Sequence, residues 1–266
     1  MSLNELSWEI ISKTPELGEE FIIKNTKNIN WDLISQYQKL SEEFIGNNSN
    51  KVNWRNISIY QKLSEKFIIK NYDKVYWLFI LMFQKLSEKF IRQNFDKMST
   101  DCLSAYQKLS EEFIREYSDK LYLYNIVRFQ KLSPEFIKKY NLIIPETNWL
   151  YKDKEFKREY IKENTNYEII GDKVIAYKSC RADGYSVFNF QYHYEVGGEY
   201  ECHADYNIDT ENSFGLSAWT KEGSLLYYSD GILFKVEIDL EDIAAIVHIG
   251  NKIRASRIKI LEEISI

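Results

Sequence analysis

Residues that could bind a metal ion gather in the last third of the chain. His193, Cys202, His203 and Asp205 are all of types that bind zinc. A structural zinc site needs about four ligands that converge on one point. Cys202 and His203 are neighbours in the sequence, and neighbours on a strand point to opposite faces of the sheet. We therefore expect no metal site here.

The sequence contains no familiar motif for nucleophilic catalysis. No GxSxG element and no cysteine motif is present, and neither a Walker loop nor a GxGxxG turn occurs. His248 lies in an apolar run, which is typical of a histidine packed in the core. The leading expectation is therefore a protein without a cofactor.

One set of polar residues loosely resembles the layout of ADP-ribosyltransferases. It consists of Tyr177 and Lys178 on an early strand, Ser213 and Ser217 on a later one, and Glu237 on a late strand. The resemblance implies NAD as cofactor, with the early residues holding the dinucleotide and the carboxylate positioning a ribose hydroxyl or the acceptor. The arginine or histidine usual on the first strand of such enzymes is missing. The alternative is that Glu237 is a strand residue facing solvent.

The elements that must carry these residues follow Pro145. We expect a charged connecting helix over 151–164, followed by strands over 173–180, 186–194, 232–239 and 243–250, with a final one from 253. Gly197 and Gly198 mark a turn, and residues 221–230 read as a short helix. Strands mixed with one or two helices predict a small α+β domain over residues 146–266.

Before Pro145 the chain repeats itself every 23 residues. Six copies begin at Trp8, Trp31, Trp54, Trp77, Thr100 and Leu123. Position 10 of each copy is Leu, and positions 14 and 15 are always Phe-Ile. A fixed period of this length is the mark of stacked helical repeats. We expect an α-helical solenoid of six αα-hairpins over residues 1–145.

Each copy carries its own helix signals. Position 11 is Ser in five copies, a preferred N-cap, while Gly18 takes its place in the first copy. Pro134 falls on the first helical position, where proline is tolerated. The Gln at position 8 recurs in five copies, and we expect it to bond the backbone between hairpins.

Positions 5 and 6 vary between copies, which predicts that they lie on the surface. In the third and fourth copies these positions include Ile59, Leu81 and Met82, and in the sixth copy they include Arg128. An exposed apolar patch usually marks a protein contact. We therefore expect these four residues to bind a partner. The alternative is that they pack inside slightly irregular repeats.

Both halves of the chain resemble proteins of phages, prophages and large viruses. The quoted repeat, YQKLSEEFI, is similar to repeats in low-GC phage proteins. The C-terminal resemblance covers about residues 170–262 and rests on these elements: Tyr177-Lys178, Tyr194 to Gly197, Ser213 to Thr220, Tyr227, Ile232 to Ile238, Asp242-Ile243, Asn251-Lys252 and Arg254. Many relatives carry His where this chain has Ser217. These families lack an assigned biochemistry, so the resemblance implies origin more than activity.

Charge and composition limit the function further. Residues 146–266 hold 14 Lys and Arg against 22 Asp and Glu, whereas residues 1–145 carry a net charge of only +3. Nucleic acid is therefore not expected as a direct ligand. The sequence shows no signal peptide, no stretch long enough to span a membrane and only three scattered cysteines, which together predict a cytoplasmic protein.

These observations lead to two expected functions. The first is a non-enzymatic interaction protein of phage or prophage type, whose solenoid binds a host protein and inhibits host defence. The alternative is an ADP-ribosyltransferase-like effector with a catalytic C-terminal domain that uses NAD.

Overall fold

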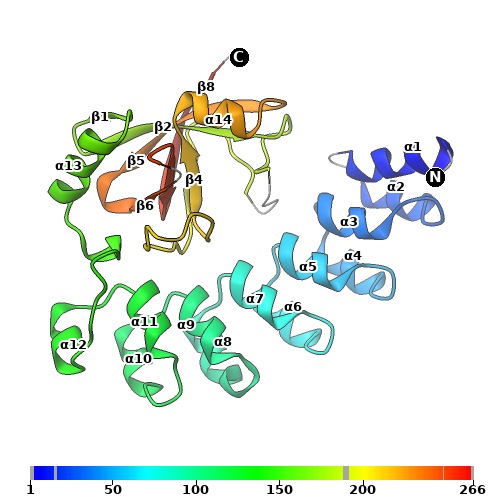
Figure 1. The fold of residues 1–266 in the computed structure, drawn as a ribbon. Coiled ribbons are helices and arrows are strands. Elements are labelled where there is room, and N and C mark those ends of the chain that lie inside the picture. Colours follow the sequence, from blue (N-terminus) through cyan, green and yellow to red (C-terminus); the bar gives the residue numbers. More distant parts are fainter. Residues whose placement is uncertain (1–2, 15–16, 188–191, 248, 265–266) are drawn as a thin grey trace. The chain divides into compact units, whose positions relative to one another are not determined.

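The computed structural model describes residues 3–14, 17–187, 192–247 and 249–264. Its first half consists of short helices that alternate along the chain at regular spacing (Figure 1). The first helix of each repeat is α1 (Leu3–Lys13), α3 (Trp31–Tyr37), α5 (Trp54–Tyr60), α7 (Trp77–Phe83), α9 (Thr100–Tyr106) or α11 (Leu123–Phe129). The second is α2 (Glu19–Lys24), α4 (Glu42–Asn47), α6 (Glu65–Lys70), α8 (Glu88–Asn94, followed by the 3-10 turn η1, Phe95–Lys97), α10 (Glu111–Glu116) or α12 (Pro134–Lys139).

The predicted helix signals are confirmed. The hydroxyl of each cap serine accepts a hydrogen bond from the backbone N–H of the Phe three residues later, as Ser41 does from Phe44 at 3.0 Å. Gly18 occupies the cap of α2 without a side-chain bond, and Pro134 begins α12. Helices of six or seven residues are too short to be stable alone, so packing against neighbours must hold them.

The predicted role of the position-8 glutamine is also confirmed. Gln61 is buried, and its Nε2 donates to Ser35 O at 3.0 Å and to Gln38 O at 2.8 Å. Its Oε1 accepts from Leu40 N at 3.1 Å. Gln38, Gln84 and Gln130 make the corresponding bonds to the repeat before them. We name this chain of side-chain bonds the glutamine ladder.

After the sixth repeat two other side chains take over the bonds of the glutamine ladder. The Asn148 Nδ2 donates to Val127 O at 3.2 Å, the carbonyl that a following Gln would bind. The Tyr151 hydroxyl donates to Gln130 O at 3.0 Å and accepts from Leu132 N at 3.3 Å. The backbone groups that the last repeat leaves open are therefore satisfied by the segment that leads into the C-terminal domain.

The C-terminal domain contains an antiparallel β-sheet, as Figure 1 shows. Its strands are β1 (Glu168–Ile170), β2 (Lys173–Cys180), β3 (Glu199–Glu201), β4 (Leu216–Trp219), β5 (Ile232–Asp239), β6 (Ile243–Val247), β7 (Lys252–Ala255) and β8 (Arg257–Ile264). Their order is β3-β8-β5-β2-β4-β7-β6, and β1 pairs with β2. The remaining elements are the 3-10 turns η2 (Trp149–Tyr151) and η3 (Leu240–Asp242) and the helices α13 (Lys154–Asn164) and α14 (Lys221–Tyr227).

The expected elements of this domain agree with the structure in most places. The strands over 173–180 and 232–239 coincide with β2 and β5, and the charged segment forms α13. The strand expected over 186–194 is wrong where the structure describes it, because only single bridges occur there, Cys180 with Ser186 and Tyr185 with His193; residues 188–191 lie outside the described residues.

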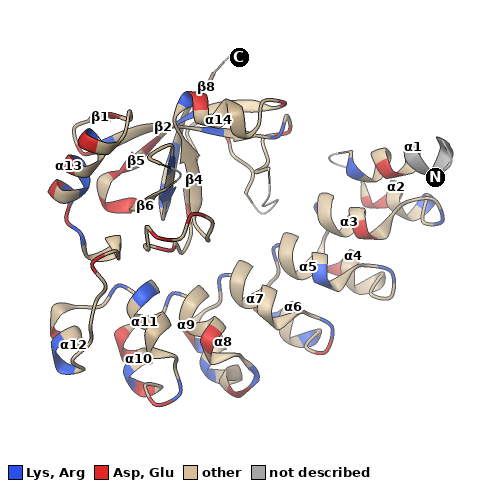
Figure 2. Cartoon of the chain, viewed as in Figure 1, with Lys and Arg blue, Asp and Glu red and all other residues tan. Residues whose placement is uncertain are grey.

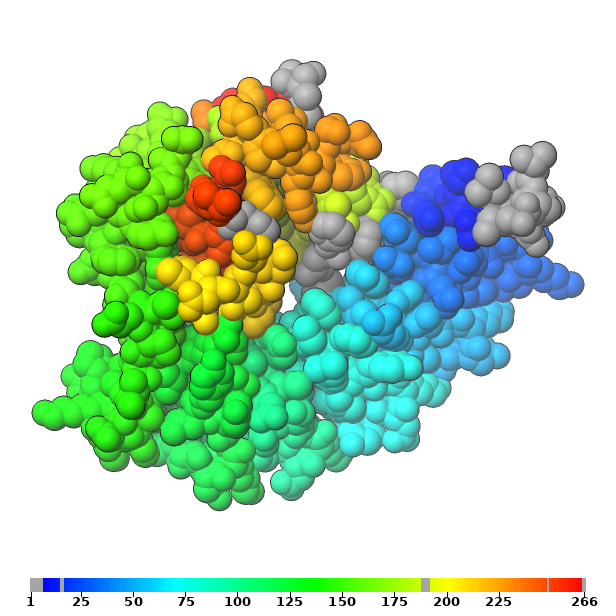
Figure 3. Space-filling view, viewed as in Figure 1, coloured from blue at the N-terminus to red at the C-terminus, as the bar shows by residue number. Residues whose placement is uncertain are grey.

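The compact units of the chain differ from its sequence domains. Residues up to Ser99 form one unit, and a second begins at Thr100, so the last two repeats pack with the C-terminal domain. Within that second unit the Phe214 ring contacts Tyr106 at 5.1 Å and Phe129 at 5.2 Å. Figure 3 shows the yellow segment that holds Phe214 directly on the green surface of these repeats. The boundary at 145/146 marks the end of the 23-residue period and stays a prediction.

Among the helices of the described residues, none is long and apolar enough to cross a membrane.

Candidate functional site

The residues of the ADP-ribosyltransferase-like layout lie on two faces of the sheet. Tyr177 pairs with Trp219 and Ile175 pairs with Glu237, so Tyr177, Ser217 and Glu237 share one face. Lys178 follows Tyr177 on β2 and therefore points to the other face. Ser213 precedes β4 and belongs to no strand. The structure does not bring all five predicted residues together.

The Glu237 carboxylate forms ion pairs with two neighbouring lysines. Its carboxylate lies 2.6 Å from the Lys173 amine and 4.0 Å from that of Lys259. β4 and β5 border β2 on opposite sides, which puts their backbones about 10 Å apart, or two strand spacings. Ser217 and Glu237 are thus separated by a whole strand.

Lys178 is buried inside the domain. Its amine donates to Ser217 O at 2.8 Å and lies 4.8 Å from the centre of the Tyr194 ring. Burial lowers the pKa of this amine, because an apolar environment disfavours the charged form. These contacts hold the ends of β2 and β4 together, which is a structural role for a residue that the sequence suggested as a dinucleotide ligand.

The two histidines weighed as zinc ligands bond backbone carbonyls instead. The Nε2 of His193 donates to Asp183 O at 3.0 Å, and that of His203 donates to Ala105 O at 3.1 Å. Among the described residues no group of three or more His, Cys, Asp or Glu side chains is placed to hold a metal ion. His248 lies outside the described residues.

The expectation that Leu81 is exposed is wrong. Its side chain is fully buried, and position 5 is interior in other copies too, as at Ser35 and Ser58. The Ser58 hydroxyl donates to Trp54 O at 2.7 Å and accepts from Tyr76 N at 3.0 Å. Position 5 thus joins one repeat to the next. Leucine replaces this polar link with apolar packing.

Arg128, which the sequence suggests as a partner-binding residue, contacts a loop of the C-terminal domain within the second unit. Its guanidinium lies 3.0 Å from the Asp205 carboxylate and donates to the Thr210 hydroxyl at 2.7 Å. Asp205 is fully buried and also lies 3.6 Å from the Arg254 guanidinium. No local sequence pattern indicates this cluster, because Arg128 and Asp205 lie 77 positions apart. Arg128 ties the sixth repeat to the C-terminal domain.

The fourth repeat exposes apolar residues that the sequence reasoning missed. Tyr76 is 50% and Leu78 48% exposed, while Ile59 and Met82 are half-buried. We call these four residues the first-helix surface. In Figure 2, α7 carries neither a blue nor a red residue, whereas α3 and α5 each carry a charge. The sequence itself shows these apolar residues, because Tyr76 and Leu78 stand on either side of Trp77.

Tyr76 stands where earlier repeats carry a helix cap. Asn30 and Asn53 occupy this position before α3 and α5, and their side chains accept bonds from backbone N–H groups of the first turn. Tyr76 gives α7 no side-chain cap. At the next exposed position, Arg55 of the third repeat is replaced by Leu78. The fourth repeat has lost a cap and a charge and gained two exposed apolar side chains.

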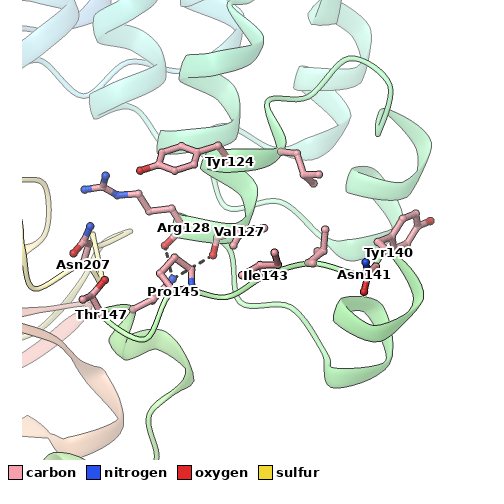
Figure 4. A pocket seen from close by; sticks show the side chains of 12 residues that line it. Tyr124, Val127, Arg128, Tyr140, Asn141, Ile143, Pro145, Thr147 and Asn207 are labelled. Atoms are coloured by element: carbon pink, nitrogen blue, oxygen red, sulfur yellow. Dashed lines mark hydrogen bonds between the residues drawn. The ribbon is translucent and has the colours of Figure 1, made fainter.

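A pocket of about 430 Å³ lies at the end of the sixth repeat (Figure 4). Its apolar wall comes from α11 and from the chain that follows α12, namely Leu123, Val127, Leu142, Ile143 and Pro145. Polar lining residues are Tyr124, Arg128, Tyr140, Asn141, Thr147, Asn148 and Asn207. In Figure 4 the Arg128 guanidinium, the Tyr124 hydroxyl and the Asn207 amide lie on one side of the pocket.

Neither the pocket nor the first-helix surface contains the predicted catalytic residues. Comparisons of the chain with protein-family models, with curated proteins and with solved structures gave no match.

Proposed function

We propose that the chain is a non-enzymatic protein-interaction protein, in which the helical repeats form a solenoid that binds a partner through the first-helix surface. The observation that carries this proposal is the replacement of Asn53 and Arg55 by Tyr76 and Leu78 at equivalent exposed positions of the next repeat.

Stability alone does not account for this replacement. An asparagine cap is worth about 1 kcal/mol to a helix, and α7 has given it up. The buried halves of Tyr76 and Leu78 offset a loss of this size, but folding does not explain why apolar groups replace a polar and a charged one where half of each side chain stays in water. A partner that covers Tyr76 and Leu78 would supply the missing burial, and aromatic residues are enriched at the centres of protein interfaces.

The glutamine ladder supports the solenoid. The second, third, fourth and sixth repeats each bond the backbone of the repeat before them through the glutamine at position 8, so these repeats meet their neighbours in the same way. Repeats that contact only their neighbours build extended structures, and such structures bind macromolecules along one surface.

The charge of the first helices indicates what the partner surface is like. Residues 31–40, 54–63 and 77–86, which contain α3, α5 and α7 and the turns that follow them, carry four cations against one carboxylate, Asp32; the cations are Lys39, Arg55, Lys62 and Lys85. A complementary partner surface has carboxylates around an apolar centre. The resemblance to phage proteins favours a host-cell protein as partner, and interference with host defence as the outcome of binding.

The test exchanges the fourth repeat's residues for those of the third. The double variant Tyr76→Asn/Leu78→Arg and the wild type are used as bait in a bacterial host lysate, and bound proteins are identified by mass spectrometry. A stoichiometric partner should bind the wild type and be lost from the variant. Ile69→Lys on α6, where Ile69 is 36% exposed, is the matched control and should keep the partner.

The ADP-ribosyltransferase alternative is tested in parallel with the same preparations. An NAD-consumption assay should give the same rate for the wild type and Glu237→Gln. NAD loss that disappears in Glu237→Gln would replace our proposal with the enzymatic one. A partner retained by Tyr76→Asn/Leu78→Arg would show that binding occurs at another surface.

A further inference from the structure

The pocket at the end of the sixth repeat has the size and lining of a small-molecule site. Its volume of about 430 Å³ lies within the range of about 300–1,000 Å³ that is usual for ligand pockets. Its walls expose apolar groups to water: Ile143 is 86% exposed and Leu123 49%. Such exposure is costly unless something covers these groups.

Two groups on the Arg128 side of the pocket can still donate a hydrogen bond. The Asn207 Oδ1 accepts from Asp209 N at 2.9 Å, which leaves the Nδ2 of that amide as a donor, whereas the Asn148 Nδ2 already donates to Val127 O and Arg128 O. The Arg128 Nε is buried and has no hydrogen-bond partner among the described residues. A ligand that accepts hydrogen bonds suits this side of the pocket better than one that donates them.

The charge beside the pocket is positive and unbalanced. Asp205 is the shared carboxylate of two guanidinium groups, those of Arg128 and Arg254. Arg254 is fully buried, and Arg128 is the only charged side chain among the described residues that line the pocket. Two cations and one anion leave an excess positive charge where screening by water is weak. An anionic group in the pocket would balance it.

We propose that this pocket binds a small apolar carboxylate, with its carboxylate beside Arg128 and Asn207 and its hydrocarbon part against Val127, Leu142 and Ile143. The charge excess favours a carboxylate over an alcohol or an amine. The five apolar wall residues favour an alkyl or aromatic body over a sugar or a nucleotide. The proposal does not depend on the partner proposed for the first-helix surface.

The probe is decanoate, titrated into the full chain by calorimetry below its micelle concentration. We expect saturable binding at one site. Octanoate, shorter by two methylenes, should bind about fifteenfold more weakly, because each buried methylene tightens binding about fourfold. Decanol should bind at least tenfold more weakly than decanoate, and decyltrimethylammonium should not bind.

Two variants assign the binding to the pocket. Ile143→Asp puts a carboxylate on an exposed position of the wall and should abolish decanoate binding without loss of folding. Leu226→Asp, the same change at a residue of α14 that is 90% exposed, is the control and should bind as the wild type does. Asn207→Asp keeps the acceptor for Asp209 N and should weaken decanoate, but not decanol, about tenfold.

Equal binding of decanol and decanoate would overturn the proposal, since the guanidinium excess would then play no part. Absence of decanoate binding, or binding that Ile143→Asp leaves intact, would overturn it as well.

Discussion

The Tyr151 hydroxyl donates to the backbone oxygen of Gln130 over 3.0 Å, the bond that Gln61, Gln84 and Gln130 each make to the glutamine before them. A phenol ends the glutamine ladder, because the polypeptide has left the 23-residue period and Asp153 stands where the next glutamine of the period would be. With Asn148 it satisfies the carbonyls that a seventh repeat would have bound. Asn148 and Tyr151 together thus end the series of repeats.

Replacing Tyr151 by Phe should destabilise the second compact unit by about 1–2 kcal/mol. The substitution leaves Gln130 O and Leu132 N without their partner, and an unpaired buried group costs about that much. Urea unfolding followed by circular dichroism measures the loss. Tyr122→Phe removes a hydroxyl from a side chain that is 51% exposed and should change the free energy of unfolding little. Equal effects of both changes would contradict the role of Tyr151.

His203 should make the stability of the second unit depend on pH. Burial lowers its pKa to about 4, against 6.5 for a free histidine. Between these pH values the unfolded chain therefore binds a proton on His203 that the folded chain does not bind. The free energy of unfolding falls as the pH drops from about 6.5 towards 4. The full effect of this shift is about 3 kcal/mol. The stabilisation is complete above pH 6.5.

The measurement compares the wild type with His203→Gln by urea unfolding at pH 7, 6 and 5. The difference in unfolding free energy between the two proteins should shrink as the pH falls. Carboxylates titrate alike in both proteins, so they cancel in the comparison. A difference that stays constant from pH 7 to 5 would show that His203 does not titrate in this range.

The helical half of the fold follows from the sequence because its signals are local. Cap serines, the proline at the start of α12 and the glutamine at position 8 act within one repeat or on the next, and the structure confirms each. At position 5 the structure differs from the prediction, because residues that vary between copies are buried there. Both serine and leucine fit this position, because the hydroxyl of Ser58 forms hydrogen bonds with the backbone, while the Leu81 side chain fills the same interior space with carbon.

The C-terminal domain was predicted only in outline, since its contacts join distant residues. Strands such as β2 are visible as runs of β-rich residues, but the order of eight strands is decided by packing that no local pattern records. Arg128 looked like a variable surface residue for the same reason. Its partner Asp205 lies on a loop of the C-terminal domain.

Asp205→Asn should be among the most harmful single changes in the second unit. It removes the charge between Arg128 and Arg254 and leaves two guanidinium groups facing each other with little water. Breaking a buried ion pair by removing one partner costs about 3–5 kcal/mol. Urea unfolding measures the loss, and Asp209→Asn at an exposed position of the same loop is the control. Equal free energies of unfolding for the two variants would show that the ion pairs of Asp205 with Arg128 and Arg254 do not stabilise the second unit.

Leu81→Ala and Met82→Ala separate interior from surface in the fourth repeat. Leu81 is fully buried, so its truncation should cost about 2–5 kcal/mol, the range for a core leucine. Met82 is half-buried on the first-helix surface, and its truncation should cost under about 1 kcal/mol while weakening capture of the partner. Unfolding of each variant and the lysate capture described above are measured on the same preparations. Met82→Ala that destabilises as much as Leu81→Ala would place Met82 in the core and remove it from the binding surface. Normal capture by a folded Met82→Ala would leave Tyr76 and Leu78 to account for binding alone.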